Sequence, residues 1–186
     1  MIKLAKFHLI LLLVIGLFFA SCQKNKQNKD WQIYKTPYFQ IEYPNQFEFV
    51  KKGQHNEKGD KMLQQASFFL YANDSLEASE DGFQANINLL IQDLKGLSYD
   101  LDNFVEDSEN QINGLIKNSA ILESKTTKNF HRIKYKGTLD DRELYFYQHY
   151  QLNKDQAFIL TFSSTKKNYE IYLPVVDSIF NSFHIK

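Results

Sequence analysis

The sequence is poor in three residue types that form crosslinks, tight turns or phosphate-binding loops. Of its 186 residues, one is cysteine, three are proline and seven are glycine. A single cysteine cannot form an internal disulfide, so the fold must be stabilised by burial of apolar side chains. The glycines are isolated, and the closest pair is Gly53 and Gly59. This spacing excludes the glycine-rich loops of dinucleotide-binding and P-loop proteins.

An excess of charge of either sign is also missing. The chain has 22 basic and 22 acidic residues, and its formal net charge is zero. Proteins that bind nucleic acid through its phosphates present a basic surface, and this composition offers none. We therefore expect no nucleic-acid partner.

Motifs for catalysis and metal binding are missing as well. The histidines after the first thirty residues have no HxxH or HExxH spacing, and no GxSxG elbow is present. Ser163 and Ser164 end a predicted strand, where catalytic serines can lie, but ordinary strand-end polarity is the alternative. Two acidic groups lack EF-hand spacing and glycine: Asp74, Glu77, Glu80 and Asp81, and Asp100, Asp102 and Asp107. We expect no enzymatic activity, no cofactor and no metal.

The N-terminal residues have the features of an export signal. Two lysines precede an uncharged run from Leu9 to Ala20. A membrane span needs about 17–25 residues, so this run is too short to cross a bilayer. It has the length and flanks of the hydrophobic region of a signal peptide. We expect residues 1–21 to be removed by cleavage between Ser21 and Cys22.

The one cysteine, Cys22, indicates the type of signal. It follows two small residues, Ala20 and Ser21, and the segment resembles the lipobox of bacterial lipoproteins, although Phe19 stands where leucine is more usual. The resemblance implies that the Cys22 thiol is lipidated and becomes the mature N-terminus. Acyl chains would then hold the protein on a membrane. An ordinary signal peptide followed by a chance cysteine is the alternative.

The residues after Cys22 bear on where the protein lies. Residues 23–30 contain no apolar side chain and are predicted to form a short flexible tether. The folded domain, residues 31–186, would therefore lie close to the membrane. Gln23 is compatible with sorting to the outer membrane, and no acidic run of the kind used for surface display follows. We expect the periplasmic face of the outer membrane of a Gram-negative bacterium.

Alternating apolar residues predict strands through much of the domain. In residues 83–91 the apolar side chains are expected to point inward and Gln84, Asn86 and Asn88 outward. The other predicted strands are residues 38–43, 47–50, 66–71, 120–127, 128–137, 142–152 and 157–163.

Two segments have helical periodicity. Apolar residues between Leu101 and Ile116 fall on one stripe, and Asp100 is the predicted N-cap. Residues 169–183 repeat in the same way, but proline is unfavourable inside a helix. We therefore expect a loose turn first and a regular helix starting near Pro174. The last residues, 182–186, are predicted to be a short strand or an extended tail.

Tight turns between the later strands indicate how they pair. Gly137 and the pair Asp140-Asp141 predict one hairpin turn, and residues 153–155 predict the next. Short connections favour antiparallel pairing. The order of strands, helix, meander and helix predicts an α+β fold, in which helices pack on a central antiparallel sheet as an α/β/α sandwich.

Four short segments stand out: YFQIEYP (38–44), FQANIN (83–88), AFILTF (157–162) and IFNSF (179–183). They resemble the PsbP-like domain, and the resemblance covers residues 33–186. The family implies an α/β/α sandwich around an antiparallel sheet. Its members include an extrinsic subunit of photosystem II, a Ran-binding nuclear transport factor and bacterial envelope lipoproteins. The resemblance therefore implies a binding or scaffold module, and it supplies no catalytic residue.

One strand contains a candidate binding surface. Alternation places Tyr145, Tyr147 and His149 on the same face, where they could form a ligand-facing wall. Pairing with the preceding strand is expected to bring His131 or Tyr135 alongside. Aromatic residues are common in strands, so packing of the sheet beneath a helix is the alternative.

A small motif predicts a modification. Asp74-Ser75-Leu76 resembles the acceptor for O-glycosylation of exported proteins in some Gram-negative bacteria, which makes Ser75 a candidate site. A pattern of three residues often arises by chance, and Asp177-Ser178-Ile179 is a second match.

The sequence as a whole predicts a membrane-anchored envelope lipoprotein without enzymatic activity. Its domain is expected to bind a protein partner in the envelope or to support a membrane complex. The alternative is a carrier of a small apolar or lipid ligand, held in a pocket between the sheet and a helix.

Overall fold

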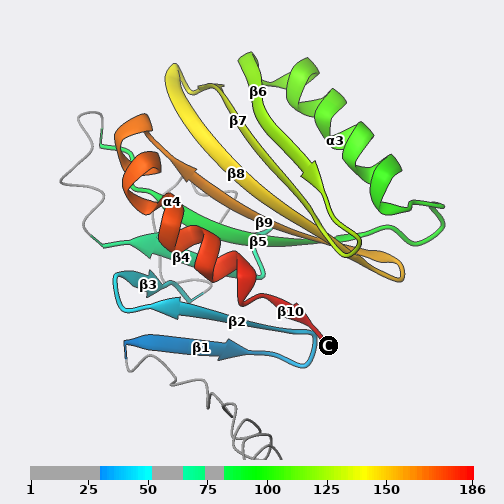
Figure 1. Cartoon of the computed structure of the whole chain (residues 1–186), viewed down its shortest axis with the longest axis horizontal. Helices are drawn as coiled ribbons and strands as arrows, with labels where there is room; N and C mark the ends of the chain where they lie inside the picture. The colour runs from blue at the N-terminus through cyan, green and yellow to red at the C-terminus, as the bar shows by residue number, and fades with distance from the viewer. Residues whose placement is uncertain (1–29, 52–64, 74–81) are drawn as a thin grey trace, which may run out of the picture.

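The computed structural model describes residues 30–51, 65–73 and 82–186, which form two antiparallel sheets and two helices (Figure 1). The helices are α3 (Leu101–Leu115) and α4 (Lys166–Asn181). The strands are β1 (Trp31–Lys35), β2 (Phe39–Pro44), β3 (Phe47–Phe49), β4 (Phe68–Ala72), β5 (Asn86–Asp93), β6 (Lys117–Thr126), β7 (His131–Leu139), β8 (Arg142–Asn153), β9 (Gln156–Ser164) and β10 (His184–Ile185).

The larger sheet has seven strands in the order β3-β4-β5-β9-β8-β7-β6, and the smaller has three in the order β1-β2-β10. Neighbouring strands are antiparallel in both. The α+β fold predicted from the sequence is confirmed. The smaller sheet was not expected, because β1 had no clear alternation and β10 pairs with β2 from the other end of the chain.

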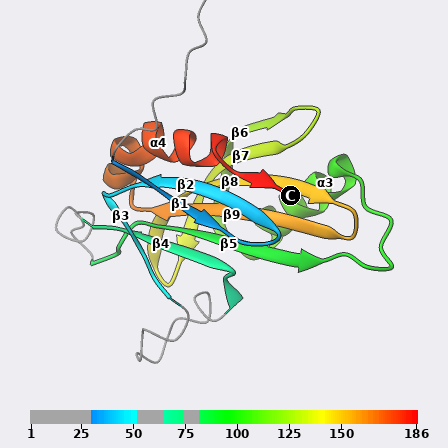
Figure 2. The same ribbon diagram turned by 90° about the horizontal axis from the view of Figure 1, so that it is seen from below.

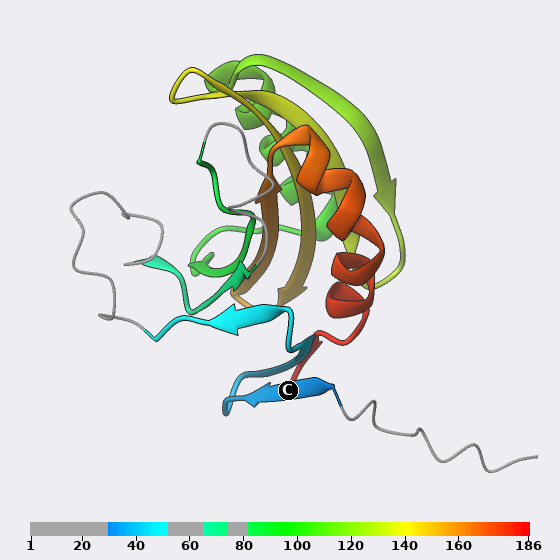
Figure 3. The ribbon, with the colours of Figure 1, turned by 90° about the vertical axis from the view of Figure 1, so that its left-hand side faces the viewer.

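The two helices pack on opposite faces of the larger sheet (Figures 1 and 3). The face that carries α4 is also covered by the smaller sheet, which lies across β5 and β9 (Figure 2). We call this the α4 face and the opposite one the α3 face. Neither helix in the described part of the chain is long and apolar enough to cross a membrane.

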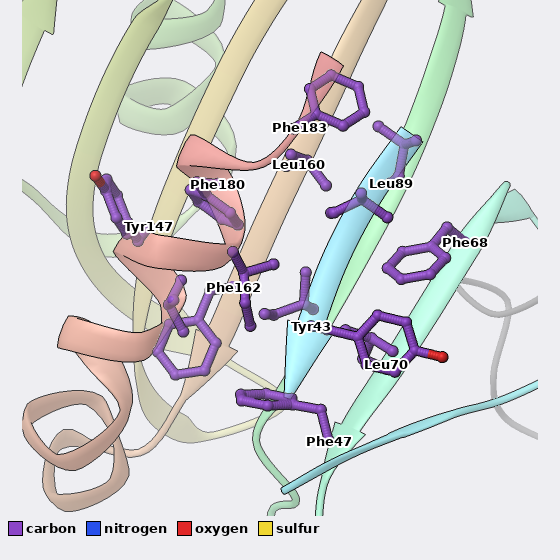
Figure 4. Packing of buried hydrophobic residues seen from close by; sticks show 14 of the residues in the cluster. Tyr43, Phe47, Phe68, Leu70, Leu89, Tyr147, Leu160, Phe162, Phe180 and Phe183 are labelled. Carbon is purple, nitrogen blue, oxygen red and sulfur yellow. The ribbon is translucent and has the colours of Figure 1, made fainter. Parts of the chain in front are cut away.

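Strand alternation divides the core between these two faces. On β9, Phe158, Leu160 and Phe162 are fully buried on the α4 face, whereas Ala157 and Ile159 belong to the cluster on the α3 face. The α4-face core is rich in phenylalanine and also joins β2, β4 and β5 (Figure 4). Burial of large aromatic side chains is its main source of stability.

The turn between β7 and β8 is formed by Asp140 and Asp141. Both have positive φ, 50° and 59°, and Leu139 pairs with Arg142, so this is a two-residue hairpin loop of the I′ kind. Gly137 does not belong to the turn, contrary to the prediction. It lies within β7, where a Cβ atom would stand 2.3 Å from Cγ2 of Ile116. Glycine is needed there because the chain leaving α3 packs against the strand.

Helix α4 runs through Pro174 without interruption, so the prediction of a loose turn before a helix was wrong. Proline removes one backbone donor and crowds the preceding turn. Tyr169 and Tyr172, which precede it, are each only 7% exposed. Their burial against the sheet holds the first half of α4 in helical conformation. The predicted N-cap of α3 is confirmed, because the Asp100 carboxylate accepts a hydrogen bond from Asn103 N at 2.8 Å.

The polar side of β5 is buried, which also differs from the prediction. Asn86 and Asn88, expected to face solvent, are 5% and 9% exposed. They lie on the α3 face, and the sheet has protein on both of its faces. The alternation in sequence had indicated that one side of β5 faces the core and the other faces solvent. In the structure, protein covers both sides of this strand.

Candidate functional site

The predicted aromatic wall lies on the α4 face of β8. Tyr147 and His149 are 2% and 1% exposed, and Tyr145 is half-buried. The ring of Phe180, on α4, lies 5.0 Å from the Tyr147 ring and 5.9 Å from the His149 ring. Tyr145 contacts Tyr169 of the same helix. The three side chains pack beneath α4, as the alternative interpretation had it.

The expected neighbours of His149 were wrong. His149 of β8 pairs with Arg132 of β7, and Arg132 Nε donates a hydrogen bond to Nδ1 of His149 at 3.1 Å. The ring of Phe130 stacks on the imidazole at 4.8 Å. His131 and Tyr135 lie on the α3 face. The sequence does not determine the register of β7 against β8, and this register places the even-numbered residues of β7 on the α4 face.

A polar network around Arg132 attaches α4 to the sheet. The guanidinium lies 3.2 Å from Oδ1 of Asp177 and donates a hydrogen bond to Oδ1 of Asn181 at 2.7 Å. The Tyr147 hydroxyl donates to the same Asp177 oxygen at 2.6 Å. Burial and this hydrogen bond raise the pKa of Tyr147, so it stays protonated. Both helix residues thus bind groups of the sheet, which supports a structural role for this face.

His149 is neutral within this network. Burial, with a smaller contribution from the positive charge of Arg132, lowers the pKa of His149 to about 3. Because Nδ1 accepts the hydrogen bond from Arg132, the proton is on Nε2, which is buried and has no hydrogen-bond partner. The imidazole therefore cannot act as an exposed base at neutral pH.

A concave region lies on the other side of the sheet, under α3. Two adjoining hollows of about 410 and 290 Å³ open between α3 and strands β5, β9, β8 and β7. We call them together the α3 groove. The residues that line both are Gln92, Gln111, Ile116, Tyr135, Gln148 and Ile159.

A row of polar side chains crosses the floor of the groove. The register pairs Thr161 of β9 with Asn88 of β5 on one side and with Gln148 of β8 on the other. Gln148 Nε2 donates a hydrogen bond to Thr161 Oγ1 at 3.0 Å, and the Tyr150 hydroxyl is hydrogen-bonded to the Gln148 carbonyl oxygen. The Gln148 amide is therefore fixed in orientation at the centre of the floor.

The next row contains two buried polar atoms that lack partners. Ser163 is 1% exposed and lines the larger hollow, and its Oγ makes no hydrogen bond. Asn86 pairs with it across the strands, and its Oδ1 also has no partner, although its Nδ2 donates to Gln84 O at 3.2 Å. Unpaired buried polar groups are costly. Ser163 and Ser164, considered together from the sequence, point to opposite faces of the sheet.

Exposed apolar side chains stand at the rim of the groove. Leu97 and Leu115 line the smaller hollow and are 55% and 80% exposed, and Leu139 lines the larger and is 45% exposed. Solvent-exposed leucines around a concave surface are a feature of ligand-binding sites.

Helix α3, which forms one wall of the groove, is held by a second network. The Ser124 hydroxyl of β6 donates to Oε1 of Glu109 on α3 at 2.6 Å and lies 3.4 Å from Nε2 of His131. The Thr126 hydroxyl is 2.9 Å from Nδ1 of the same imidazole. Burial lowers the pKa of His131, so this ring is also neutral at neutral pH.

Several residues singled out in the sequence lie outside the described residues. They include the lipidation and cleavage positions, the candidate glycosylation site and the first acidic group: Ser21, Cys22, Ser75, Asp74, Glu77, Glu80 and Asp81. Within the described ranges, no group of three histidine, cysteine, aspartate or glutamate side chains is arranged to hold a metal ion.

The sequence did not reveal the α3 groove. Asn88, Gln148 and Thr161 occupy alternate positions of three strands, and each was compatible with a solvent-facing residue. The available signal was that strands β8 and β9 carry amide and hydroxyl groups on the same side as apolar residues such as Phe146 and Ile159.

Comparison with known proteins relates the whole fold to others. No protein-family model matches the sequence, and no curated protein matches it. The solution structure of cyanobacterial PsbP (CyanoP) from Synechocystis superposes with a TM-score of 0.55 at 13% identity, covering 90% of this chain and 99% of that one. The chain has a PsbP-like fold. The resemblance seen in the sequence is thereby confirmed at the level of the fold.

A second solved structure is similar. LpqN of Mycobacterium tuberculosis, described as involved in cell envelope biogenesis, superposes with a TM-score of 0.57 at 8% identity, covering 84% of this chain and 90% of that one. At such low identity the two likenesses establish a shared PsbP-like fold and no shared chemistry.

Proposed function

We propose that this protein is a lipid-anchored, non-enzymatic protein of the bacterial envelope whose PsbP-like domain binds another protein or supports a membrane complex. The observation that carries the proposal is a segment with the sequence features of an export signal, which ends at Cys22 in front of a PsbP-like fold. A diacyl- or triacyl-modified cysteine gives stable membrane attachment. The similar fold of LpqN, a protein involved in cell envelope biogenesis, agrees with this assignment.

The length of the tether restricts where a partner can lie. Only residues 23–30 separate Cys22 from the first strand, β1. The domain would therefore stay within a few nanometres of the bilayer, since an extended chain spans at most about 3.3–3.6 Å per residue. We place it on the periplasmic face of the outer membrane, where a partner would be an envelope protein.

Crosslinking in intact cells tests this proposal. Wild type and Cys22→Ala would be crosslinked and purified by affinity, and an alkyne-palmitate label would report lipidation of the same samples. We expect the label and a reproducible envelope partner with wild type, and loss of both with Cys22→Ala. Recovery of no partner, or of the same partner in equal amount with Cys22→Ala, would contradict the anchored binding module.

A second candidate function is favoured by the α3 groove. Its larger hollow, about 410 Å³, falls in the range of about 300–1,000 Å³ that is usual for small-molecule sites. A carrier of a small apolar or lipid ligand would hold it there, on the face opposite the aromatic wall that suggested a carrier from sequence. Native mass spectrometry of protein purified from its own membrane, compared with a Gln111→Trp variant that fills the groove, would detect retained cargo.

A further inference from the structure

We infer that the α3 groove binds an uncharged molecule that carries hydroxyl or amide groups on an apolar body. This inference rests on the carrier function and names the class of ligand. It follows from the charge, the polar groups and the apolar surface of the groove.

The first observation is that the larger hollow of the groove is lined by uncharged side chains. Among the described residues that line the larger hollow, none is an acid, a lysine, an arginine or a histidine. Burial raises the pKa of Tyr135, so its phenol also stays neutral. In the smaller hollow the acid is Asp107, which is hydrogen-bonded to Tyr99. In the larger hollow an ionic ligand would lose its hydration without gaining an opposite charge, which disfavours binding there.

The second observation is a set of polar groups on the floor. Asn88, Thr161 and Gln148 form one row, and Ser163 stands in the next row with an unpaired hydroxyl, 1% exposed. Hydroxyl and carboxamide groups both donate and accept hydrogen bonds. They match a ligand that does the same, such as one with hydroxyl or amide groups. The Ser163 hydroxyl, which lines the larger hollow without a partner, is the group that most needs such a ligand.

The third observation is the apolar surface next to these rows. Leu90 and Ile159 form a row on the floor, and Phe146 and Ile116 also line the larger hollow. The exposed side chain of Leu115 continues this surface to the rim of the smaller hollow. A purely polar ligand would leave these side chains uncovered, whereas an apolar body would remove them from water.

The matched variants come from neighbouring positions of α3. Gln111 lines both hollows and is exposed, so Gln111→Trp would fill the groove without disturbing the core. Asn110 is also exposed and lines neither hollow, so Asn110→Trp is the control for a large residue on this helix. Circular dichroism would verify that both variants fold. A third variant, Ser163→Ala, removes the unpaired hydroxyl.

The probes differ in charge but share a chain length. Octyl glucoside, with hydroxyl groups on an octyl chain, would be compared with octyl sulfate and octyl trimethylammonium below their micelle concentrations. Binding would be followed by two-dimensional NMR, through the side-chain amides of Gln92, Gln111 and Gln148. We expect octyl glucoside to shift these amides and to bind about tenfold more tightly than either ionic probe. Gln111→Trp should weaken it by a similar factor, Asn110→Trp should not, and Ser163→Ala should weaken it about threefold.

The outcomes separate the ligand class from the carrier function. Equal binding of the three probes at the groove would overturn the inference of an uncharged ligand and leave the carrier function standing. Shifts of none of the groove amides by any probe, or binding that Gln111→Trp leaves unchanged, would overturn both. Octyl glucoside binding that is selective, located at the groove and blocked by Gln111→Trp would support both.

Discussion

The two faces of the seven-stranded sheet are built differently although the same strands form them. On the α4 face, phenylalanine and tyrosine rings fill the space beneath the helix, and Arg132 and Asp177 are paired with each other, although Nε2 of His149 has no hydrogen-bond partner. On the α3 face, amides and hydroxyls share the floor with apolar residues and a groove remains open. The comparison shows that α4 packs tightly on its side of the sheet, whereas a groove remains open beside α3.

The largest effect should come from removing an aromatic ring on the closed face. Phe180→Ala would leave a cavity against Tyr147 and His149, and we expect the free energy of unfolding to fall by about 3–5 kcal/mol. Leu115→Ala, at the exposed rim of the groove, should change it by less than about 0.5 kcal/mol. Urea denaturation of both variants measures this, and equal losses would erase the distinction between the faces.

The next effect is a loss of stability in acid. His149 has a pKa of about 3 in the folded state and near 6.5 in the unfolded chain, so below pH 6.5 only the unfolded chain binds its proton. Its contribution is complete above pH 6.5 and is lost as the pH falls toward 3. Between about pH 7.5 and 5 we expect a loss of about 2 kcal/mol from this group.

Replacing the histidine tests this pH dependence. His149→Gln cannot titrate, so its stability should fall less steeply between these pH values. The lowered pKa of His131, on the α3 face, contributes in the same direction and should remain in this variant. Urea denaturation at several pH values gives the two slopes. Identical slopes for wild type and His149→Gln would show that His149 is not buried as a neutral ring.

A smaller effect is expected from the carboxylate that joins α4 to the sheet. Asp177→Ala removes the partner of Arg132 and of the Tyr147 hydroxyl, and should cost about 1–2 kcal/mol because the carboxylate is partly exposed. Glu170→Ala removes an exposed carboxylate from the same helix and serves as the control. A cost for Asp177→Ala no greater than that of the control would argue against the network.

The smallest effect compares the half-buried Ser182 with the buried Ser163. Ser182 accepts a hydrogen bond from Glu42 N at 2.9 Å and donates to Ile179 O at 2.6 Å, so Ser182→Ala should cost about 1 kcal/mol. Ser163→Ala removes an unpaired hydroxyl and should leave stability unchanged or raise it by up to about 1 kcal/mol. Thermal unfolding of the ligand-free proteins would give both, and a clear loss for Ser163→Ala would mean that its hydroxyl is paired.

Much of the fold could be predicted from the sequence, because local patterns determine it. Apolar alternation identified most strands, and Asp100 marked the start of α3. Pro174 misled because its local penalty was outweighed by burial of the tyrosines before it. Gly137 misled because it is needed where Ile116 packs closely against β7. This is a contact between separate elements, which no local sequence pattern contains.

The candidate site could not be predicted, because it depends on register. Asn88, Gln148 and Thr161 are far apart in sequence and become neighbours only when β5, β9 and β8 pair as they do. Tyr147 and His149 were correctly placed on one face of a strand, but periodicity does not say whether a helix covers that face. Both questions depend on long-range packing.

The most direct test of this account is the reactivity of cysteines placed on the two faces of β9. In a Cys22→Ala background, Thr161→Cys lies in the groove and Leu160→Cys in the closed core beneath α4. A small methanethiosulfonate reagent should modify Thr161→Cys in the folded protein and Leu160→Cys only as fast as the protein unfolds. Modification of both at the same rate, or faster modification of Leu160→Cys, would contradict the assignment of one closed face and one open face.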